Sequence, residues 1–375
     1  MNRAGQYVNA LGGIASYKAY KPNPLPPFRE IEMDAEMVSL LSKAHNYLGK
    51  LDMIFELIPD MNLFLGPYVR KEALLSSQIE GTQATLEDVL NPNINTAINL
   101  DVNDVVNYAN ALNYAIERMK ELPICNRLLC DIHRVLMQGV RGQEKSPGEF
   151  RHSQNWIGSS NSDLLTARYV PPTVEDMLIA MGDLERFINN YDMDILLKTA
   201  SAHYQFETIH PFLDGNGRVG RMFITLMLLS DGILHKPILY LSLFLKGNRI
   251  EYYDWLSEVR VKGNYEQWIK FFLIGIIETC DDGVKTIESL NSLIKADEEK
   301  NAKKTETFSK VFNYIKEHPI FSIGGAATAL DLSYNGVSET VKKMIKAGIL
   351  NEVTSKARDR VFEYSGYIAI LKSGT

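Results

Sequence analysis

The 375-residue sequence contains only three cysteines, Cys125, Cys130 and Cys280, and no run of apolar residues close to the ~20 that a membrane-spanning helix needs. The spacing of the cysteines matches no metal-binding pattern, and their neighbours are mostly apolar, so we expect buried, reduced thiols. The first residues, Met-Asn-Arg-Ala-Gly-Gln, lead into no apolar segment of the secretory type. These absences predict a soluble, cytoplasmic protein with no membrane partner.

Composition does not single out a function class. The formal net charge is −6, and 45% of the residues are hydrophobic against 23% charged, which excludes an intrinsically disordered chain. The sequence shows no internal repeat. Its length allows two or three domains. The evidence for function must therefore come from local motifs.

The most informative stretch is His-Pro-Phe-Leu-Asp-Gly-Asn-Gly-Arg-Val-Gly-Arg at residues 210–221. Apolar periodicity predicts helices on both sides of it, over 195–206 and 219–229. The glycines at 215 and 217 permit positive φ, which lets a turn direct successive N–H groups at one anion. The following helix, expected to begin at about Arg218, would add its N-terminal N–H groups. The stretch therefore predicts an anion-binding loop.

The charged side chains of this loop indicate which anion. Arg218 and Arg221 are three residues apart, so they share one helix face, and each can bind phosphate oxygens in a bidentate way. Asp214 offers a hard oxygen ligand for Mg²⁺ that is held mainly by a nucleotide's phosphates. His210 titrates near neutrality, where a general base would be useful. A polar loop with a capping Asp and solvated arginines is the alternative that the glycine-rich turn alone leaves open.

Residues 210–221 match every fixed position of the Fic family signature, His-Pro-Phe-x-Asp-Gly-Asn-Gly-Arg-x-x-Arg, and the chain therefore resembles that family. The resemblance implies a mainly α fold, with a Fic/Doc-type helical core and a β-hairpin flap. It also implies transfer of AMP from ATP to a Ser, Thr or Tyr hydroxyl of a protein, with Mg²⁺, His210 as the base and Asp214 as the metal ligand. Nucleotide contacts are implied for Asp214 and for the rest of the signature: Pro211, Phe212, Leu213, Gly215, Asn216, Gly217, Arg218 and Arg221.

A second motif lies at the end of a helix expected to run from Leu65 or Pro67 to Glu80, with Gly81 stopping it. A carboxylate in the last turn of a helix opposes the helix dipole, so it needs water or a cation as partner. Ser76-x-x-x-Glu80-Gly81 resembles the inhibitory motif of the Fic family. The resemblance implies that Glu80 pairs with Arg221 in the place of the nucleotide γ-phosphate. A solvated glutamate is the open alternative.

The segment 151–172 is rich in Ser and Asn and ends in two prolines, which predicts a β-hairpin. The family resemblance implies a flap at about 150–172, with Ile157 and Gly158 at the edge that receives a target's backbone by strand addition. It also implies an adenine and ribose pocket lined by Tyr252, Tyr253 and Arg260. An ordinary surface hairpin and core packing are the respective alternatives. His133 is predicted to be a packing residue rather than a catalytic one.

The expected domains are an N-terminal helical region (1–110) with the inhibitory helix, a catalytic core (111–290) and a C-terminal domain (302–375). Residues 1–30 are expected to be extended and rich in proline. The C-terminal domain carries a net charge of +4. It resembles a winged helix-turn-helix, with these expected elements: helices at 307–317, 323–330 and 334–347 and strands at 350–353 and 361–364.

The C-terminal domain offers several side chains to the phosphates or the groove of DNA: Ser338, Lys342, Lys343, Lys356, Arg358 and Arg360. Its positive charge is modest and Glu339 lies in the expected recognition helix, so a protein contact is favoured over DNA. Other transfers by a Fic-type site (phosphoryl, UMP or phosphocholine), removal of AMP, and a DNA-binding regulator with a self-modifying core stay open. The expected partner is a protein substrate, the chain itself included, and a homodimer is consistent with the sequence.

Overall fold

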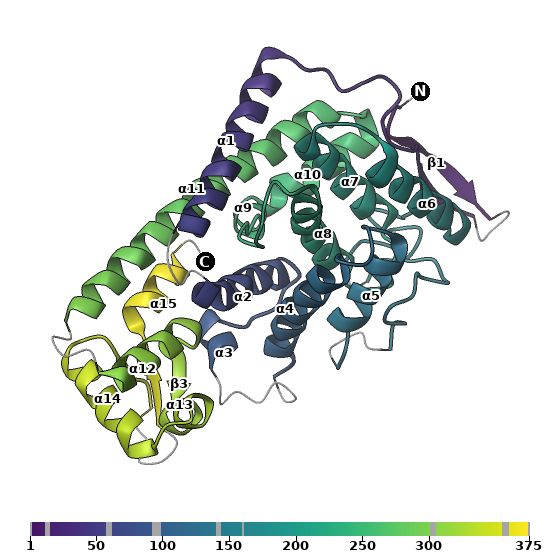
Figure 1. Cartoon of the computed structure of the whole chain (residues 1–375). Helices are drawn as coiled ribbons and strands as arrows, with labels where there is room; N and C mark the ends of the chain where they lie inside the picture. The colour runs from purple at the N-terminus through teal and green to yellow at the C-terminus, as the bar shows by residue number, and fades with distance from the viewer. Residues whose placement is uncertain are drawn as a thin grey trace. The chain divides into compact units, whose positions relative to one another are not determined.

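The computed structural model describes residues 2–11, 16–57, 62–91, 99–139, 144–159, 161–300, 305–354 and 360–373. The chain is mainly helical, as predicted (Figure 1). It divides into two compact units, and each unit combines separate stretches of sequence. The first unit comprises residues 1–48, 107–237 and 244–278, and the second comprises residues 49–106, 238–243 and 279–375. The domain boundaries expected from the sequence stay predictions.

The first unit begins with a β-hairpin of β1 (Gly5–Ala10) and β2 (Tyr17–Pro22), paired antiparallel from Gly5 opposite Pro22 to Ala10 opposite Tyr17. The sequence predicts only an extended segment here. The pairing depends on contacts with distant parts of the chain. The N–H of Tyr20 donates to the carbonyl of Val170 at 3.0 Å, and Ala10 and Ala19 pack against the Val170 side chain. The local sequence pattern does not predict such long-range contacts.

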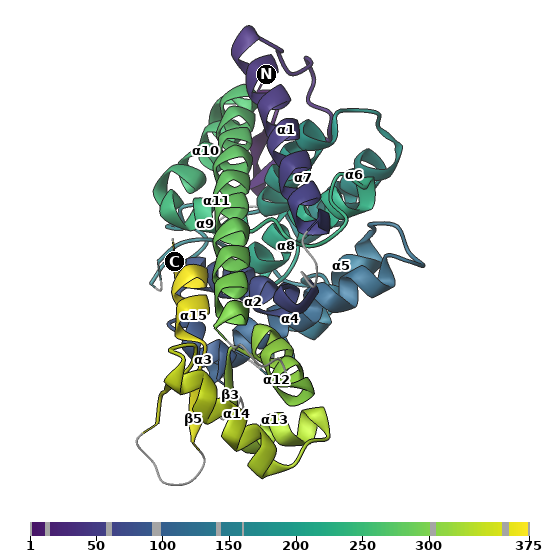
Figure 2. The same ribbon diagram turned by 60° about the vertical axis from the view of Figure 1, so that its left-hand side comes forward.

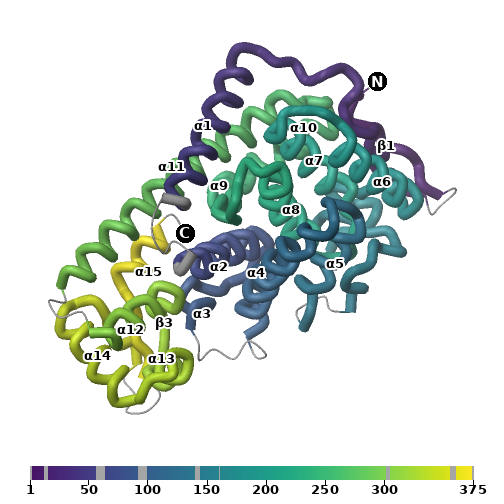
Figure 3. The backbone as a smooth tube through the Cα atoms, viewed as in Figure 1, coloured from purple at the N-terminus to yellow at the C-terminus, as the bar shows by residue number. Residues whose placement is uncertain are grey.

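The helical core of the first unit is built around α7 (Ile195–Ile209), whose residues from Leu196 onward are all buried except Lys198. Helix α8 lies beside it, as the tube in Figure 3 shows, and α6 and α10 also contact α7. The Trp268 indole donates to the Ala200 carbonyl at 2.9 Å and so fixes α7 from another side. The other helices wholly in this unit are α5 (Asn126–Leu136), α6 (Val174–Asn190), α8 (Asn216–Asp231) and α10 (Arg249–Lys262).

Some helices contribute residues to both units: α1 (Ala35–Leu57), α4 (Leu100–Arg118), α9 (Ser242–Gly247) and α11 (Tyr265–Glu299). Helix α11 continues well beyond Thr279, through a charged stretch of the sequence. The observed helix keeps an apolar face beyond that point, where Val284, Ile287 and Leu290 are buried.

The second unit contains α2 (Asn62–Ile79), which carries the predicted inhibitory motif near its end, and α3 (Leu86–Leu90). Helix α3 begins with a capping box between Thr85 and Asp88. Helix α2 ends at Ile79, one residue before the predicted end, and Gly81 follows with φ of +103°, a value that L side chains rarely adopt.

The C-terminal part of the second unit has these elements: α12 (Glu306–Glu317), β3 (Ile320–Ser322), α13 (Ile323–Leu330), α14 (Tyr334–Lys346), β4 (Asn351–Glu352), β5 (Val361–Glu363) and α15 (Ser365–Lys372). The strands form an antiparallel sheet in the order β3-β5-β4, and the helices gather beside it (Figure 2). Strand β3 and helix α15 were not expected. The winged-helix assignment stays a prediction, and Lys356 and Arg358 lie outside the described residues.

Helix α15 packs against α2 in this unit. The Tyr367 ring stacks on Phe64 with 5.7 Å between centroids. The buried Lys71 ammonium donates to the Ser373 carbonyl at 3.0 Å and lies over the Tyr240 ring, and burial lowers the pKa of Lys71. The helix with the predicted inhibitory motif is therefore anchored by the C-terminal helix.

The structure shows how far the cysteines are buried and whether any helix is apolar enough to span a membrane. Cys280 is buried as predicted, but Cys125 and Cys130 are only partly buried, which corrects the expectation for those two thiols. Within the described ranges, no helix combines the length and the apolar character that a membrane crossing requires.

Candidate functional site

His210 ends α7 in a left-handed backbone conformation, with φ of 51° and ψ of 62°. Its N–H still donates to the Phe206 carbonyl at 2.9 Å, so the residue caps the helix and then turns the chain into the loop. The His210 side chain is half-buried. The structure thus places the predicted base at the mouth of the loop.

The loop is closed by the side chain of Asn216, which makes two hydrogen bonds to the backbone of Phe212. The Phe212 N–H donates to Asn216 Oδ1 and Asn216 Nδ2 donates to the Phe212 carbonyl, each at 2.8 Å. Gly215 has φ of +77°, and α8 begins at Asn216, two residues before the predicted start. The N–H groups of the first turn of α8 therefore meet the end of the loop, where an anion is favoured. The Asn216 side-chain amide therefore stabilises the loop through its hydrogen bonds with Phe212.

Asp214 presents an ionised carboxylate beside this helix end. Its Oδ1 accepts from the Gly215 N–H at 2.6 Å, and its Oδ2 lies 3.0 Å from Lys145 Nζ. Burial acts to raise the pKa of Asp214, but the hydrogen bond and charge of Lys145, the Gly215 N–H and the charge of Arg218 bring it below its usual value. An ionised carboxylate is the kind of oxygen ligand that Mg²⁺ prefers.

Arg218 and Arg221 lie in the first two turns of α8 and are 7% and 3% exposed. This burial excludes the alternative of solvated arginines. Burying a guanidinium is costly unless it is paired or hydrogen-bonded, so both positions suit interaction with anionic groups. One nitrogen of Arg218 lies 3.6 Å from the sulfur of Met137, which fixes the direction of that side chain.

Phe212 is fully buried below the loop. Its ring stacks on His133 with 3.9 Å between centroids and 9° between planes, and Phe150 and Phe206 surround it. Burial, with a smaller effect from the charge of Arg218, lowers the pKa of His133 to about 4, so that imidazole is neutral at pH 7. Pro211 is buried as well. We therefore expect Pro211 and Phe212 to position the loop rather than to touch a nucleotide.

Arg151 is a structural support of the site that no sequence motif predicted. The residue is 1% exposed, and its guanidinium donates to three backbone carbonyls, those of His210, Ser153 and Pro172. Its own N–H donates to the Pro211 carbonyl at 2.9 Å. Arg151 thus joins both ends of the segment 153–172 to the start of the signature. The only sequence signal was its place at the start of the Ser- and Asn-rich stretch.

The close approach of α7 and α8 depends on Gly220. A Cβ atom at this position would lie 2.3 Å from Glu207 Oε1 and 3.1 Å from a Phe206 ring carbon. We expect Gly220→Ala to lower the free energy of unfolding by about 1–3 kcal/mol, because the buried neighbours must shift. Urea denaturation would measure the change.

Gly182 in α6 supplies the matched control, because nothing lies within 4 Å of a Cβ built there. Gly182→Ala should stabilise the protein by up to about 1 kcal/mol, since alanine is the better helix former. Equal effects at the two glycines would contradict the spacing argument.

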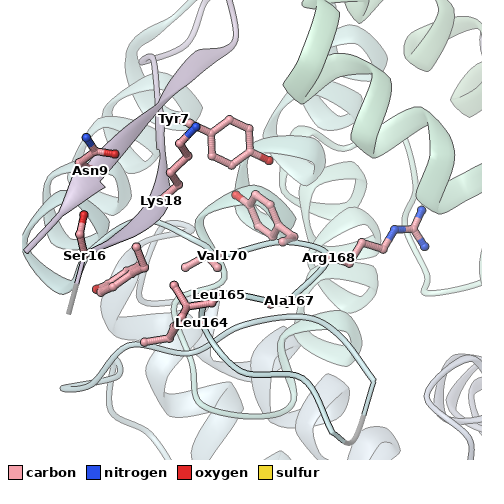
Figure 4. Close-up of a pocket in the computed structure, with 11 residues that line it drawn as sticks. Tyr7, Asn9, Ser16, Lys18, Leu164, Leu165, Ala167, Arg168 and Val170 are labelled. Carbon is pink, nitrogen blue, oxygen red and sulfur yellow. The ribbon is translucent and has the colours of Figure 1, made fainter. Parts of the chain in front are cut away.

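The predicted flap contains one antiparallel bridge, in which Ile157 and Tyr169 exchange backbone hydrogen bonds of 2.8 and 3.0 Å. Ile157 is 37% exposed and its neighbour Trp156 is 43% exposed. Since Ile157 turns its own N–H and carbonyl toward Tyr169, the backbone groups of Trp156 and Gly158 face the opposite edge. This geometry suits the predicted strand addition, which stays a prediction. A groove of about 460 Å³ is lined by residues of both the flap and the β1–β2 hairpin, among them Lys18 and Arg168 (Figure 4).

The predicted nucleotide residues of α10 differ in burial. Tyr252 is fully buried, and its hydroxyl lies 2.9 Å from His203 Nε2, while His203 Nδ1 lies 2.9 Å from the Gly220 carbonyl. Burial lowers the pKa of His203 to about 3, so this imidazole is neutral. Tyr252 therefore belongs to the core, and the alternative of packing holds for it in this structure.

The other two residues of that group are partly exposed. Tyr253 lies under the guanidinium of Arg249, 5.8 Å from the ring centroid. Arg260 lies over the ring of Tyr169, 4.2 Å from its centroid, and thereby connects α10 with the flap. Both stay candidates for nucleotide contact.

The inhibitory motif belongs to the second unit. Ser76 is buried within α2, and Glu80 follows the last helical residue, with its N–H donating to the Ser77 carbonyl at 3.0 Å. The pairing of Glu80 with Arg221 stays a prediction.

The first unit thus presents a loop between two packed helices, with a histidine at its mouth and two buried arginines at the start of the second helix. This arrangement suits an anion at the end of the loop. Comparison with known families makes this more specific. Residues 38–117 match the model described as Fic/DOC family N-terminal, and residues 123–228 match the Fic/DOC family model. The chain belongs to the Fic/DOC family.

Relatives and solved structures agree with this assignment. The chain is 32% identical over 146 residues to a protein adenylyltransferase Fic of Culex quinquefasciatus, which covers 38% of this chain and 26% of the relative. A protein of the same name from Drosophila erecta is 28% identical over 166 residues, which covers 44% of this chain and 30% of the relative. The chain thus spans less than a third of the length of these two relatives.

Two solved structures share the fold. A Fic family protein from Desulfovibrio desulfuricans G20 has a TM-score of 0.57 and 19% identity, covering 90% of this chain and 98% of its own. A Fic domain containing signaling protein from Bacteroides thetaiotaomicron has a TM-score of 0.51 and 16% identity, covering 66% of this chain and 97% of its own.

Proposed function

We propose that this protein transfers AMP from ATP to a Ser, Thr or Tyr hydroxyl of a protein. The observation that carries the proposal is the loop at 210–221, where a half-buried His210 stands beside an ionised Asp214 and two buried arginines at the start of α8. The names of the curated relatives support the same activity.

The reaction requires that the hydroxyl oxygen bond to the α-phosphorus while the bond from that phosphorus to the bridging oxygen breaks and pyrophosphate leaves. His210 accepts the proton of the hydroxyl. Its place at the C-terminal end of α7 favours a positive charge on the ring. The first-turn N–H groups of α8 and the Arg218 guanidinium stabilise the charge on the α-phosphoryl oxygens, and Arg221 holds the γ-phosphate.

Asp214 fits the role of Mg²⁺ ligand, since its carboxylate is ionised. When bound, Mg²⁺ would neutralise negative charge on the nucleotide's phosphates. Lys145, whose ammonium lies 3.0 Å from one Asp214 oxygen, adds positive charge beside that carboxylate. The remaining contacts with the nucleotide are assigned to Leu213, Gly215, Gly217, Tyr253 and Arg260.

The proposal includes autoinhibition by the motif at Ser76, Glu80 and Gly81. It is supported by the sequence match and by the end of α2 at Ile79, with Gly81 at positive φ two residues later. Pairing of Glu80 with Arg221 would keep that guanidinium from the γ-phosphate and leave ATP in an unproductive pose. Replacing Glu80 by glycine removes the carboxylate and should activate the enzyme.

Label transfer from ATP tests the activity and the inhibition together. The label is placed on the α- or the γ-phosphate, and wild type and Glu80→Gly are incubated with Mg²⁺, alone and with a cell lysate. We expect label only from the α position, with strongly more in Glu80→Gly than in wild type. Label from the γ position would instead indicate phosphoryl transfer, and equal labelling of the two proteins would refute the inhibition.

Several finer points belong to the same proposal. The target docks on the flap edge at Ile157 and Gly158, a second copy of the chain is one such target, and the protein acts in the cytoplasm. DNA binding by residues 302–375 is the less favoured alternative. Lys342 pairs with Glu339 at 2.7 Å and Arg360 pairs with Glu352, which reduces the positive charge that this domain offers.

A further inference from the structure

His133 is a buried histidine that the proposed reaction does not use. It lies in α5, far from the signature in sequence, and is 1% exposed. Both of its ring nitrogens have hydrogen-bond partners. Nδ1 accepts from the Gly148 N–H at 2.9 Å, and Nε2 lies 3.0 Å from the backbone carbonyl oxygen of Asp214.

These two partners define the protonation state of the ring. A backbone N–H can only donate, so Nδ1 carries no proton. A backbone carbonyl can only accept, so Nε2 carries one. The two hydrogen bonds exist together only in the neutral tautomer with the proton on Nε2. His133 therefore acts as a bridge that accepts on one side and donates on the other.

The ring also covers the loop surface. It stacks on Phe212 with 3.9 Å between centroids, and a Cβ atom at Gly215 would lie 3.4 Å from the ring carbon Cδ2. His133 thus touches the loop at Phe212, Asp214 and Gly215. These residues include the predicted metal ligand and the left-handed glycine from which α8 starts.

The segment that His133 bonds on its other side also reaches Asp214. Gly148 lies three residues after Lys145, whose Nζ is 3.0 Å from Asp214 Oδ2. The segment therefore holds Asp214 at two points, the backbone carbonyl through His133 and the side chain through Lys145. Loss of the imidazole would release the carbonyl and leave only the contact of an exposed lysine, which is worth little in water.

We propose that His133 is a positioning residue, which fixes the Asp214 peptide and thereby aims the Asp214 carboxylate and the start of α8 at the nucleotide phosphates. The identity of the ligand rests on the proposed function, whereas the bridge itself rests only on the distances above. His133 does not touch the reacting atoms and acts through Asp214.

Three substitutions separate the contributions of the ring. In His133→Asn the amide oxygen is two bonds from Cβ, as Nδ1 is, so the acceptor for Gly148 is kept. In His133→Gln the amide nitrogen is three bonds from Cβ, as Nε2 is, so the donor to Asp214 is kept. His133→Phe keeps the stacking on Phe212 and loses both hydrogen bonds.

Each variant is measured in three ways. Amide hydrogen exchange of residues 212–217 without nucleotide reports the order of the loop. Calorimetry with ATP and Mg²⁺ gives Kd, and α-label transfer in the Glu80→Gly background gives kcat and KM. We expect the protection of the loop from exchange, the affinity for ATP and the kcat/KM to decrease in the order wild type, Gln, Asn, Phe. The kcat/KM of the Phe variant should be lower by about 10–100-fold, and that of the Gln variant should be close to wild type.

Other results would overturn the proposal. If the three variants lose activity equally and in step with their melting temperatures, His133 only packs. If the loop of the Phe variant exchanges as slowly as in wild type, the bridge does not order the loop. Nitrogen-15 spectra of wild type at pH 7 that place the proton on Nδ1 would contradict the assigned tautomer. Absence of α-label transfer in every protein would remove the proposed function, yet the exchange order would still decide the role of His133.

Discussion

Replacing His210 by alanine should lower the rate of AMP transfer by about 10²–10⁴-fold, the usual contribution of a general base. The structure gives the reason for a loss of this size. His210 lies at the mouth of the loop, and its left-handed backbone is held by Arg151 and Asn155, whose side chains donate to its carbonyl at 3.1 and 3.4 Å. These backbone contacts persist in the variant, so only the imidazole is lost.

The measurement is the initial rate of α-label transfer in the Glu80→Gly background. His152→Ala is the matched control, because His152 has a side chain that is 77% exposed and pairs only with Glu149 in the described part of the chain. The control should keep the full rate, and calorimetry should show that His210→Ala still binds ATP with Mg²⁺. A rate within a few-fold of the parent would remove His210 from the role of base.

The helices and the loop were largely predictable because their signals are local. Apolar periodicity predicted α7, and the turn residues at 214–217 predicted the reversal between α7 and α8. Helix α8 was predicted to begin at about Arg218, two residues after its observed start, because asparagine is common in turns. In the structure the Asn216 amide bonds back to Phe212 and so permits helical geometry from that point.

What the sequence did not reveal depends on contacts between distant residues. Strand β2 bonds to the backbone of Val170, and the buried Tyr252 hydroxyl lies within hydrogen-bond distance of His203. The pattern around His133 correctly predicted packing. It could not show that both ring nitrogens bond to backbone groups, one of them in the signature. The residues that support a site by hydrogen bonds lie far from it in the sequence, so neither apolar periodicity nor motif spacing predicts them.

Replacing Arg151 by methionine should lower the free energy of unfolding by about 3–5 kcal/mol, because three hydrogen bonds from a buried charged donor are lost. Methionine keeps much of the volume, but the Ser153 and Pro172 carbonyls lose the donor that Arg151 supplies, and the His210 carbonyl keeps the Asn155 amide at 3.4 Å. Burial lowers the pKa of Arg151 only to about 10, so the guanidinium is charged at pH 7.

Urea denaturation of Arg151→Met, Arg151→Lys and Arg186→Met tests this expectation. Lysine keeps the charge but cannot reach three carbonyls with a planar fork, so it should recover only part of the loss. Arg186 has a side chain that is 70% exposed and pairs with Asp183 in α6, so its replacement should change stability by less than about 0.5 kcal/mol. Since Arg151 joins both ends of the flap segment to His210, Arg151→Lys should also lose α-label transfer while it remains folded. Full activity and stability in the lysine variant would show that charge, rather than the three directed hydrogen bonds, holds the flap against the site.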